Sequence, residues 1–483
     1  MAELLAARDA AVTGDMVELR LDGVANLDVA RALHGRRVPA VVTCRPMWEG
    51  GHFEGGEDER RAILATALDI GAEFVDIEWR AVDGHATGVP FQALLDTTPE
   101  RVVVSSHDFD GVPADLESRA QAMRATGAAT IKVAVSVNRV SQTLCLKSIA
   151  REGPAVVIGM GELGVASRLL AGHFGSRWTY AGDGVAPGQL PARQMIDDYG
   201  FRRVGRSTRI FGVVSSNALH SLSPVMHNAA FHAAGIDAVY VPLTVQDFGD
   251  FLVFAEDMGI EGVSVTIPFK LDALRAAESG DALARQVGAA NTLRKRGGSW
   301  EATNTDVEGF LHPLTSAWGR SLDGSRASVL GAGGAARAVI VALCSRGARV
   351  TVHARRDDQA QELAAGFSVA SGAYPPETGS WDLLVNCTPL GGAARRLESP
   401  MPADRLAGQL VYDLTYGPGE SALLRDARVA GLATLDGLAM LVAQAERQFE
   451  WWTGHRPKAG VMETAARRRL AGGEATVMQE AQT

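Results

Sequence analysis

The chain has 483 residues, of which 46% are hydrophobic and 21% are charged, and its formal net charge is -9. This composition is typical of a globular protein with about two to four domains. The acidic balance argues against a general nucleic-acid binder, which needs a basic face. The four cysteines are far apart and form no CxxC pair, which argues against a disulfide framework or a zinc site. Because neither a signal peptide nor a membrane span is predicted, we expect a cytoplasmic protein.

Short apolar, β-branched segments alternate with helix-like stretches in the first part of the chain. This pattern predicts a buried parallel sheet covered by helices. Seven segments at this spacing favour a TIM barrel, an α/β fold whose functional residues lie at the carboxyl ends of the strands. The predicted strands are 17–21, 40–46, 74–79, 101–107, 130–136, 155–161 and 178–181.

A TIM barrel has about eight strands, and we predict no strand before the helix-like segment 3–12. The first barrel strand is therefore expected to be missing. Such a gap would leave unpaired backbone at a seam of the sheet. Two explanations stay open, namely that the true start of the protein lies upstream or that this barrel is compromised.

The second half of the chain predicts further α/β units. Residues 182–209 are rich in Gly, Pro and Arg, which indicates a linker followed by a helix. Strand-like segments follow at 210–214, 239–245 and 262–268. Residues 327–356 have the order strand, glycine turn, helix, strand, which is a βαβ unit. The polar tail is expected to be disordered.

Lys132 lies within an otherwise apolar strand. Burying an ammonium without a partner is costly, so such a lysine can have a lowered pKa and attack a ketone as a free amine. His107 would be the base for the C–H next to the resulting imine. The alternative is a strand-end lysine in a surface salt bridge. Three arginines at or just after predicted strand ends could bind a carboxylate in a bidentate fork: Arg20, Arg45 and Arg168.

The first half resembles type I 3-dehydroquinate dehydratase over roughly residues 10–195, in the segments VELRLD, TCRPMWEGG, VDIEW, SSHDFDGVP, IKVAVS, GMGELGVASR, FGSRWTYAG and APGQ. The resemblance implies a Schiff base on Lys132, with His107 as general acid/base and Glu49 as its partner. One departure is Val185, where many members have a serine. The implied substrate-binding residues are Glu18, Arg20, Arg45, Arg168 and Gln189.

Gly331, Gly333 and Ala336 have the GxGxxG/A spacing between a predicted strand and a predicted helix. This spacing allows a pyrophosphate to approach a helix N-terminus, although a tight structural turn is an alternative. Arg355 and Arg356 follow the next strand, where an acidic residue would hold a ribose hydroxyl. The arginines favour NADP over NAD.

Lys270 and Asp306 would form a proton-transfer pair beside a carbonyl that is being reduced. The alternative for this pair is a salt bridge on the domain surface. Ser221 and Ser223 in the segment SLSP could bind a carboxylate, whereas an ST-turn before Pro224 is the common alternative.

This half resembles shikimate dehydrogenase over roughly residues 208–460, in FGVVSSNALHSLSPVMHNAAF, GVSVTIPFK, GAANTL, NTDVEGF, VLGAGGAARA, LLVNCTPLG, YDLTYGP and GLAMLVAQAERQFEWWTG. The resemblance implies that Lys270 and Asp306 are catalytic. The implied substrate pocket contains Ser221, Ser223, Thr266, Asn291, Thr305, Tyr416 and Gln444. The implied cofactor site contains Gly331, Ala332, Gly333, Gly334, Ala335, Ala336, Arg355, Arg356, Thr388 and Gly437.

Together the two resemblances predict a bifunctional shikimate-pathway enzyme in the order of the fused plant enzyme. It would dehydrate 3-dehydroquinate and reduce 3-dehydroshikimate to shikimate with NADP(H), without a metal, as a monomer or homodimer. Two rivals are a quinate or shikimate dehydrogenase, working with NAD or with an impaired dehydratase domain, and a non-catalytic quinate-pathway sensor. The expected domains are a barrel at 1–200, a substrate-binding domain at 208–310 completed by helices at about 436–465, a Rossmann domain at 311–435 and a disordered tail at 466–483.

Overall fold

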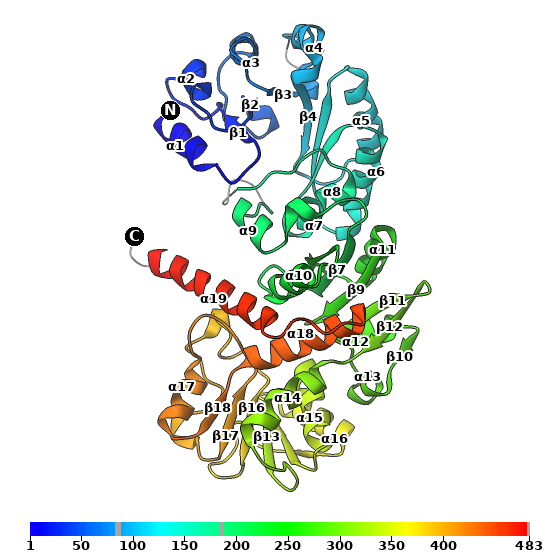
Figure 1. Ribbon diagram of the computed structural model, residues 1–483, viewed down its shortest axis with the longest axis vertical. Coiled ribbons are helices and arrows are strands. Elements are labelled where there is room, and N and C mark those ends of the chain that lie inside the picture. The colour runs from blue at the N-terminus through cyan, green and yellow to red at the C-terminus, as the bar shows by residue number, and fades with distance from the viewer. Residues whose placement is uncertain (83–87, 183–187, 481–483) are drawn as a thin grey trace. The chain divides into compact units, whose positions relative to one another are not determined.

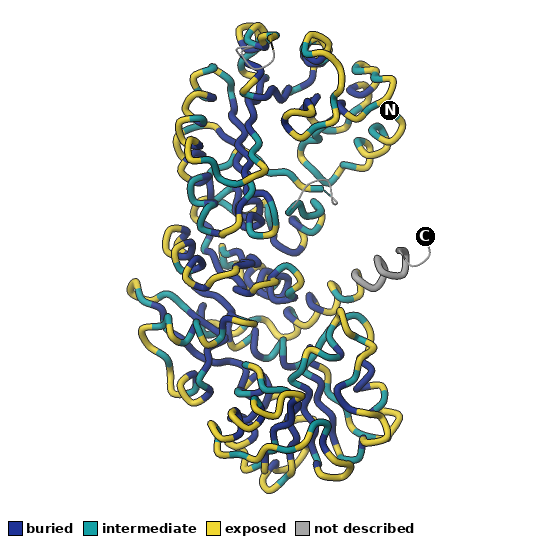
Figure 2. Tube along the Cα trace, turned by 180° about the vertical axis from the view of Figure 1, so that it is seen from behind, coloured by how far each residue is buried: buried dark blue, intermediate teal, exposed yellow. Residues whose placement is uncertain are grey.

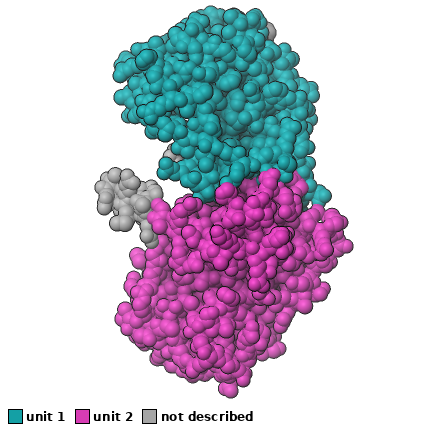
Figure 3. All heavy atoms as spheres, viewed as in Figure 1, with its two compact units in different colours: residues 1–208, 243–257 teal, residues 209–242, 258–483 magenta. Residues whose placement is uncertain are grey.

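The computed structural model describes residues 1–82, 88–182 and 188–480, with the side chains of 473–480 excepted. The chain forms two compact units (Figure 3). One comprises Met1–Thr208 and Leu243–Asp257, and the other comprises Arg209–Pro242 and Met258–Thr483. In each unit the buried residues concentrate in the strands and on the inner faces of the helices (Figure 2). In the described part of the chain, no helix is long and apolar enough to cross a membrane.

The first unit is built on one parallel sheet in the order β1-β2-β3-β4-β5-β6, with helices in the connections (Figure 1). The predicted α/β class is therefore confirmed. The strands are β1 Val17–Arg20, β2 Ala40–Thr43, β3 Phe74–Glu78, β4 Val102–Asp108, β5 Thr130–Ser136 and β6 Ala155–Met160. The helices are α1 Ala2–Ala10, α2 Val29–Leu33, α3 Glu57–Asp69, α4 Gln92–Thr97, α5 Leu116–Ala125, α6 Leu144–Glu152, α7 Val165–Leu169, α8 Ala171–Phe174, α9 Ala192–Asp197 and α11 Phe248–Met258.

The seventh predicted strand, at 178–181, is wrong. The chain begins to run along β6, because Arg177 N–H donates to the carbonyl of Ala155 at 2.8 Å. The side chain of Ser176, rather than a backbone carbonyl, accepts the next strand amide, that of Val157. Trp178 and Tyr180 then pack against an apolar cluster on β5 and β6. The two aromatic residues alternate as residues of a strand do, but among the described residues no strand pairing with β6 continues past this point. Within the described residues α1 precedes β1, and no strand lies before it.

The second unit contains two sheets and the remaining helices. The first sheet is mixed, in the order β10-β12-β11-β9-β7-β8. Its strands are β7 Arg209–Ser215, β8 Ala238–Thr244, β9 Ile260–Val265, β10 Ser279–Gly280, β11 Thr292–Arg296 and β12 Ser299–Thr303. The helices of this unit are α10 Ser223–Ala234, α12 Lys270–Ala276, α13 Ala282–Val287, α14 Asp306–Trp318, α15 Gly334–Cys344, α16 Asp357–Phe367, α17 Ala422–Val429, α18 Gly437–Thr453 and α19 Val461–Glu480.

The second sheet is parallel, in the order β15-β14-β13-β16-β17-β18. Numbered from its first strand this order is 3-2-1-4-5-6, which is the Rossmann arrangement. The predicted Rossmann domain is therefore confirmed. Its strands are β13 Arg326–Leu330, β14 Arg349–His353, β15 Ala370–Ser371, β16 Leu383–Asn386, β17 Leu410–Asp413 and β18 Ala433–Leu435.

Helices α14 and α18 connect the two sheets of this unit, and they touch. A Cβ atom added to Gly309 of α14 would lie 2.6 Å from Cβ of Gln444 on α18. Only glycine therefore allows the two helices to approach this closely. The contact joins the chain segment that enters the Rossmann sheet to the one that leaves it.

The tail predicted to be disordered from residue 466 instead continues as helix α19 to Glu480. Met462 and Ala466 are fully buried in a cluster that includes Phe231 and Trp452. Polar composition alone suggested disorder, but these few small and apolar side chains anchor the start of the helix on the core.

Candidate functional sites

The first site is formed by polar side chains at alternate positions of neighbouring strands. Residues two apart on a strand lie on the same face of the sheet. The parallel register places Lys132 on β5 directly beside Ser105 on β4. One face of the sheet thereby collects Glu18 and Arg20 from β1, Thr43 from β2, Asp76 and Glu78 from β3, Ser105 and His107 from β4, and Lys132 from β5.

Lys132 is 5% exposed, and its ammonium contacts two carboxylates and an aromatic ring. Its Nζ lies 3.1 Å from Asp76 Oδ2, 3.5 Å from Glu18 Oε1 and 4.5 Å from the ring centre of Tyr180. Burial alone would lower the pKa of Lys132, but Asp76, Tyr180 and Glu18 outweigh it and raise the pKa. The expected lowering is therefore wrong for this state. Lys132 is an ammonium that must lose its proton before it can act as a nucleophile.

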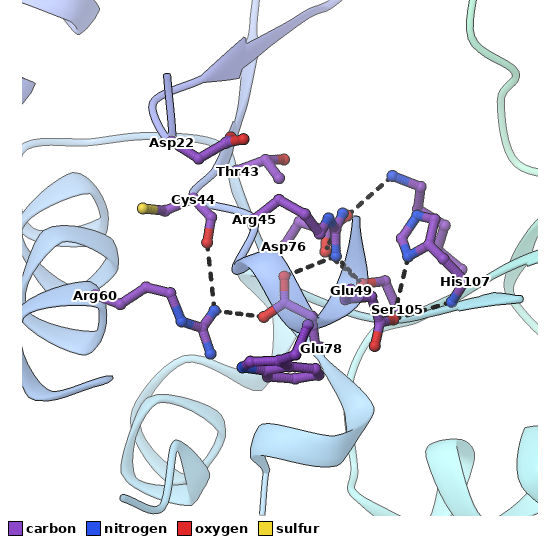
Figure 4. A network of polar contacts seen from close by, with 12 residues as sticks. Asp22, Thr43, Cys44, Arg45, Glu49, Arg60, Asp76, Glu78, Ser105 and His107 are labelled. Atoms are coloured by element: carbon purple, nitrogen blue, oxygen red, sulfur yellow. Dashed lines mark hydrogen bonds and ion pairs between the residues drawn. The ribbon is translucent and has the colours of Figure 1, made fainter. Parts of the chain in front are cut away.

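Asp76 is the central anion of this site, and sequence reasoning missed it. One oxygen contacts Lys132, while Oδ1 lies 3.0 Å from Arg45 Nη2 and accepts from Ser105 Oγ at 2.5 Å (Figure 4). Burial opposes its charge, but Arg45 and Lys132 hold the pKa of Asp76 below its usual range. A signal was present, since Asp76 and Glu78 are two apart in an otherwise apolar strand and must share a face.

Arg45, predicted to bind substrate, lies inside a buried ion-pair network. Its Nη1 donates to Glu78 Oε1 at 2.7 Å and to Ser105 Oγ at 2.8 Å. The other carboxylate oxygen of Glu78 pairs with Arg60, a fully buried arginine on α3 (Figure 4). The Arg60 guanidinium lies 4.4 Å from the ring centre of Phe91. Arg45 thus stabilises the negative charge of Asp76 at Oδ1, whereas Lys132 contacts Oδ2.

His107 and Glu49 are brought together as predicted. Glu49 Oε1 accepts the backbone N–H of His107 at 3.0 Å and lies 3.3 Å from its Nδ1 (Figure 4). Burial, together with the nearby charge of Glu78, raises the pKa of Glu49 to about 7. Burial and the charges of Arg45 and Lys132 lower the pKa of His107. The imidazole is therefore neutral at pH 7 and can accept a proton.

Two further predicted residues line the same end of the sheet. Glu18 Oε1 accepts the hydroxyl of Thr43 at 2.8 Å, which holds it near the lysine. Arg20 forms two 2.8 Å bonds to Asp22, which also accepts the backbone N–H of His52 at 3.1 Å. Arg20 is therefore held by Asp22, a residue that was not among the predicted site residues.

Arg168 and Gln189 lie in the part of the chain that follows β6. Arg168 on α7 is buried, its Nη1 is 3.4 Å from the carbonyl of Tyr180, and burial lowers its pKa to about 10. The Oε1 atom of Gln189 is buried without a hydrogen-bond partner among the described residues. Val185, the position of the departure from the family, lies outside the described residues.

The second site centres on Lys270 and Asp306, which begin helices α12 and α14. Lys270 Nζ lies 2.6 Å from Asp306 Oδ2. Asn291 Nδ2 donates to Asp306 Oδ1 at 2.8 Å and to Thr305 Oγ1 at 2.9 Å. The structure therefore brings together four of the predicted residues. The predicted surface alternative does not apply, because Asp306 is 5% exposed.

The other predicted pocket residues lie on separate elements of the second unit. Ser221 Oγ accepts the backbone N–H of Ser223 at 3.1 Å, so the ST-turn considered above is present before α10. Thr266 follows β9, and its N–H donates to the carbonyl of Val214. Gln444 on α18 packs against Gly309 of α14. Tyr416 follows β17, and burial raises its pKa.

The glycine turn between β13 and α15 has the shape that a dinucleotide phosphate requires. Gly331 has a φ of +106°, and an added Cβ would lie 3.1 Å from the carbonyl oxygen of Cys387. Gly333 precedes the helix and has open space where a side chain would be. An added Cβ on Gly334 would lie 3.1 Å from Cδ of Lys270. The turn thus combines an open helix N-terminus with direct proximity to the Lys270–Asp306 pair.

The remaining predicted cofactor residues surround this turn. Ala332 lies in the turn, whereas Ala335 and Ala336 lie in the first turn of α15, where Ala336 is fully buried. Arg355 and Arg356 are exposed directly after β14. Thr388 follows β16. Gly437 begins α18, and a side chain there would clash with the carbonyl of Leu414.

Three family models match the chain. Type I 3-dehydroquinase matches residues 2–206, the shikimate dehydrogenase substrate binding domain matches 213–293, and the shikimate 5'-dehydrogenase C-terminal domain matches 437–467. These matches agree with the two units and with the order of the two predicted activities.

Similar proteins extend the match over nearly the whole chain. The chloroplastic bifunctional 3-dehydroquinate dehydratase/shikimate dehydrogenase of Arabidopsis thaliana is 32% identical over 480 residues, covering 91% of this chain and 78% of that protein. A shikimate dehydrogenase (NADP(+)) of Methanocella arvoryzae is 41% identical over 272 residues, covering 54% of this chain and 99% of that protein. A crystal structure of shikimate dehydrogenase in complex with NADP+ has 31% identity and a TM-score of 0.52, covering 55% of this chain and 96% of that chain. The chain therefore belongs to the family of bifunctional 3-dehydroquinate dehydratase/shikimate dehydrogenases.

Proposed function

We propose that the first unit converts 3-dehydroquinate to 3-dehydroshikimate and that the second reduces this product to shikimate with NADPH. The observation that carries the proposal is a lysine–aspartate ion pair in each unit, Lys132–Asp76 and Lys270–Asp306. The family resemblances imply Lys132, Lys270 and Asp306 as site residues, and the structure adds Asp76. We assign the dehydratase to residues 1–200, and the dehydrogenase to 208–310 and 436–465 with a nucleotide-binding domain at 311–435.

In the dehydratase, Lys132 gives up a proton and its amine attacks the ketone. Loss of water then gives an imine, which carries a positive charge when it is protonated. Asp76 and Glu18, which favour the ammonium, favour this cation in the same place. The same carboxylates therefore stabilise the charge that develops during the reaction.

His107 is neutral and takes the proton from the C–H next to the imine. It then returns the proton to the departing hydroxyl, so that water leaves. Addition of a water molecule to the imine then releases 3-dehydroshikimate and restores the Lys132 amine. Ionised Glu49 stabilises the imidazolium between these two steps. We propose that Arg168 and Gln189 bind the substrate, because a carboxylate would offset the cost of the buried guanidinium. Glu18 and Arg20 complete the mouth of the pocket.

In the dehydrogenase, bound NADPH supplies the hydride. Lys270 donates a proton to the carbonyl oxygen, and Asp306 holds Lys270 in place and passes it a replacement proton taken up from water. We propose that the shikimate pocket consists of Ser221, Ser223, Thr266, Asn291, Thr305, Tyr416 and Gln444, with the two serines on the carboxylate. The turn Gly331–Gly334 would hold the pyrophosphate, and Thr388 and Gly437 would border the nicotinamide.

The test is a one-pot assay of the full chain. With 3-dehydroquinate and NADPH together, we expect shikimate as the product, identified by chromatography. With 3-dehydroshikimate and NADPH, only the second unit is needed. Reduction of 3-dehydroshikimate without any conversion of 3-dehydroquinate would refute the dehydratase assignment alone. The absence of both activities in a folded chain would refute the whole proposal.

Cofactor choice should depend on the arginines after β14. Replacing both Arg355 and Arg356 with glutamine should raise the KM for NADPH by about 10- to 100-fold, because charge-assisted bonds to the 2'-phosphate contribute about 1.5 to 3 kcal/mol. The KM for NADH should change little, since NADH lacks that phosphate. Steady-state kinetics with both cofactors measure the difference. Equal changes for the two cofactors would contradict this assignment and would leave the NAD-dependent rival open.

The dehydratase should depend on pH through Glu49. Its pKa is raised to about 7, so the carboxylate is neutral below that pH and ionised above it. Because the ionised form stabilises protonated His107, kcat/KM should rise as the pH increases through about 7. Glu49→Gln should lower the rate and remove this rise. A pH–rate profile that keeps the same inflection in Glu49→Gln would show that another group causes it.

A further inference from the structure

A row of buried side-chain hydrogen bonds crosses the second unit and ends at Asp306. Tyr240 Oη on β8 lies 2.6 Å from Ser264 Oγ on β9, which lies 2.7 Å from Gln448 Oε1 on α18. Gln448 Nε2 lies 3.0 Å from Thr292 Oγ1 on β11. We call five residues, none more than 7% exposed, the donor chain: Tyr240, Ser264, Gln448, Thr292 and Asn291.

The last links of the donor chain reach the catalytic carboxylate. Thr292 Oγ1 lies 2.8 Å from Asn291 Oδ1, which is closer than its 3.4 Å contact with Thr305 Oγ1. Asn291 Nδ2 then lies 2.8 Å from Asp306 Oδ1. Lys270 occupies the other oxygen, Oδ2.

Backbone groups fix the orientation of both amides in the donor chain. The N–H of Thr305 can only donate, and it meets Asn291 Oδ1 at 2.8 Å, so this atom is the amide oxygen. At Gln448, the atom 3.5 Å from the backbone carbonyl of Asn291 is assigned as the nitrogen, because a nitrogen can donate to that carbonyl whereas an amide oxygen in its place would face it without a hydrogen. Neither assignment depends on the carboxylate or on the lysine.

With the amides fixed, the single proton of each hydroxyl has one destination. Thr292 accepts from Gln448, so its own proton goes to Asn291. Gln448 Oε1 can only accept, so Ser264 donates to it, and Tyr240 must donate to Ser264. Every donor therefore points toward Asp306. In a buried environment such bonds polarise one another and strengthen the last of them.

We propose that Tyr240, Ser264, Gln448 and Thr292 are positioning residues for the dehydrogenase. Together with the N–H of Thr305 they hold the amide of Asn291 with its N–H toward Asp306 Oδ1, and they strengthen that bond. Proton exchange is thereby confined to Oδ2, the oxygen that faces Lys270. This inference rests on the proposed function, because it assumes that Asp306 and Lys270 handle the proton.

Thr292→Val tests the donor chain, because it removes the link to Asn291 with little change in volume. The bond from Asn291 to Asp306 Oδ1 stays in place but weakens. The acid limb of the kcat–pH profile for shikimate oxidation with NADP should move up by roughly 0.2 to 0.5 pH unit, because each bond in a buried row strengthens its neighbour by only about 10 to 30%. Thr292→Ser keeps the hydroxyl and should keep the wild-type profile.

Thr303→Val is the matched control. Thr303 pairs with Thr292 on the neighbouring strand β12, but its hydroxyl donates to Asp281 and lies outside the donor chain. It should leave the profile in place. Gln448→Leu should produce the shift of Thr292→Val, and the double variant should shift no further, because both changes break one chain.

Unshifted profiles in folded Thr292→Val and Gln448→Leu would overturn the donor chain, as would an equal shift in Thr303→Val. Asp306→Asn separates this failure from that of the proposed function. If Asp306→Asn keeps both the rate and the acid limb, Asp306 handles no proton and both proposals fail. If it is inactive while Thr292→Val is unshifted, the donor chain alone is refuted.

Discussion

Replacing Lys132 with methionine should abolish the conversion of 3-dehydroquinate, a loss on the order of 10⁴-fold or more, because it removes a covalent nucleophile. Reduction of 3-dehydroshikimate should continue at the wild-type rate, since that site lies in the other compact unit. The measurement is NADPH consumption with each substrate in turn. Borohydride added during turnover should trap a reduced adduct on the Lys132 peptide of the unmodified chain, identified by mass spectrometry.

Lys147 offers a matched control for this variant. It is another lysine of the first unit that is 5% exposed, and it pairs with Asp257 rather than with the site. Lys147→Met should lower stability without removing the adduct on Lys132. Dehydratase activity with no adduct on the Lys132 peptide would exclude the imine route.

Lys270→Met and Asp306→Asn should each lower kcat for shikimate oxidation by about 10²- to 10⁴-fold, the range expected when a general acid/base is lost. The KM for shikimate should change much less, because the other pocket residues stay in place. Dehydratase activity provides an internal measure of folding in the same sample. Steady-state kinetics with NADP at saturation give both constants.

The control for this pair lies on the same helix. Asp272 of α12 forms an exposed ion pair with Arg275, and exposed pairs contribute about 0 to 1 kcal/mol. Asp272→Asn should leave kcat within about twofold of the wild type. A similar loss in Asp272→Asn would attribute the effect to the helix rather than to proton transfer.

The sequence predicted the arrangement of both halves because the informative signals were local. Apolar runs predicted six strands of the first sheet, and one glycine turn predicted a βαβ unit of the Rossmann type, whereas the order of the strands comes from the structure. Lys132, His107 and Glu49 were found because each lies in a specific motif. The seventh strand was wrong, since aromatic residues that alternate as in a strand here pack one face without pairing their backbone.

The sequence could not predict the interactions that depend on strand register and on burial. Asp76 and Arg60 become important only when β3 lies beside β2 and α3 covers it, which no single segment encodes. The pKa of Lys132 was predicted in the wrong direction for the same reason, because its partners lie on three other segments. The start of α19 depends on a core contact that composition does not reveal.

The contact between helices α14 and α18 determines where the nucleotide-binding domain can be cut out and exchanged between related enzymes. Both connections to the Rossmann sheet carry predicted site residues, the catalytic Asp306 on α14 and the substrate-binding Gln444 on α18, and Gln444 lies at the contact with Gly309. A nucleotide-binding cassette cut between Trp318 and Gly437 would leave both helices, and the glycine that seats them, in the recipient. Cofactor preference can then be exchanged between relatives as a module, whereas a cut inside either helix would divide the pocket itself.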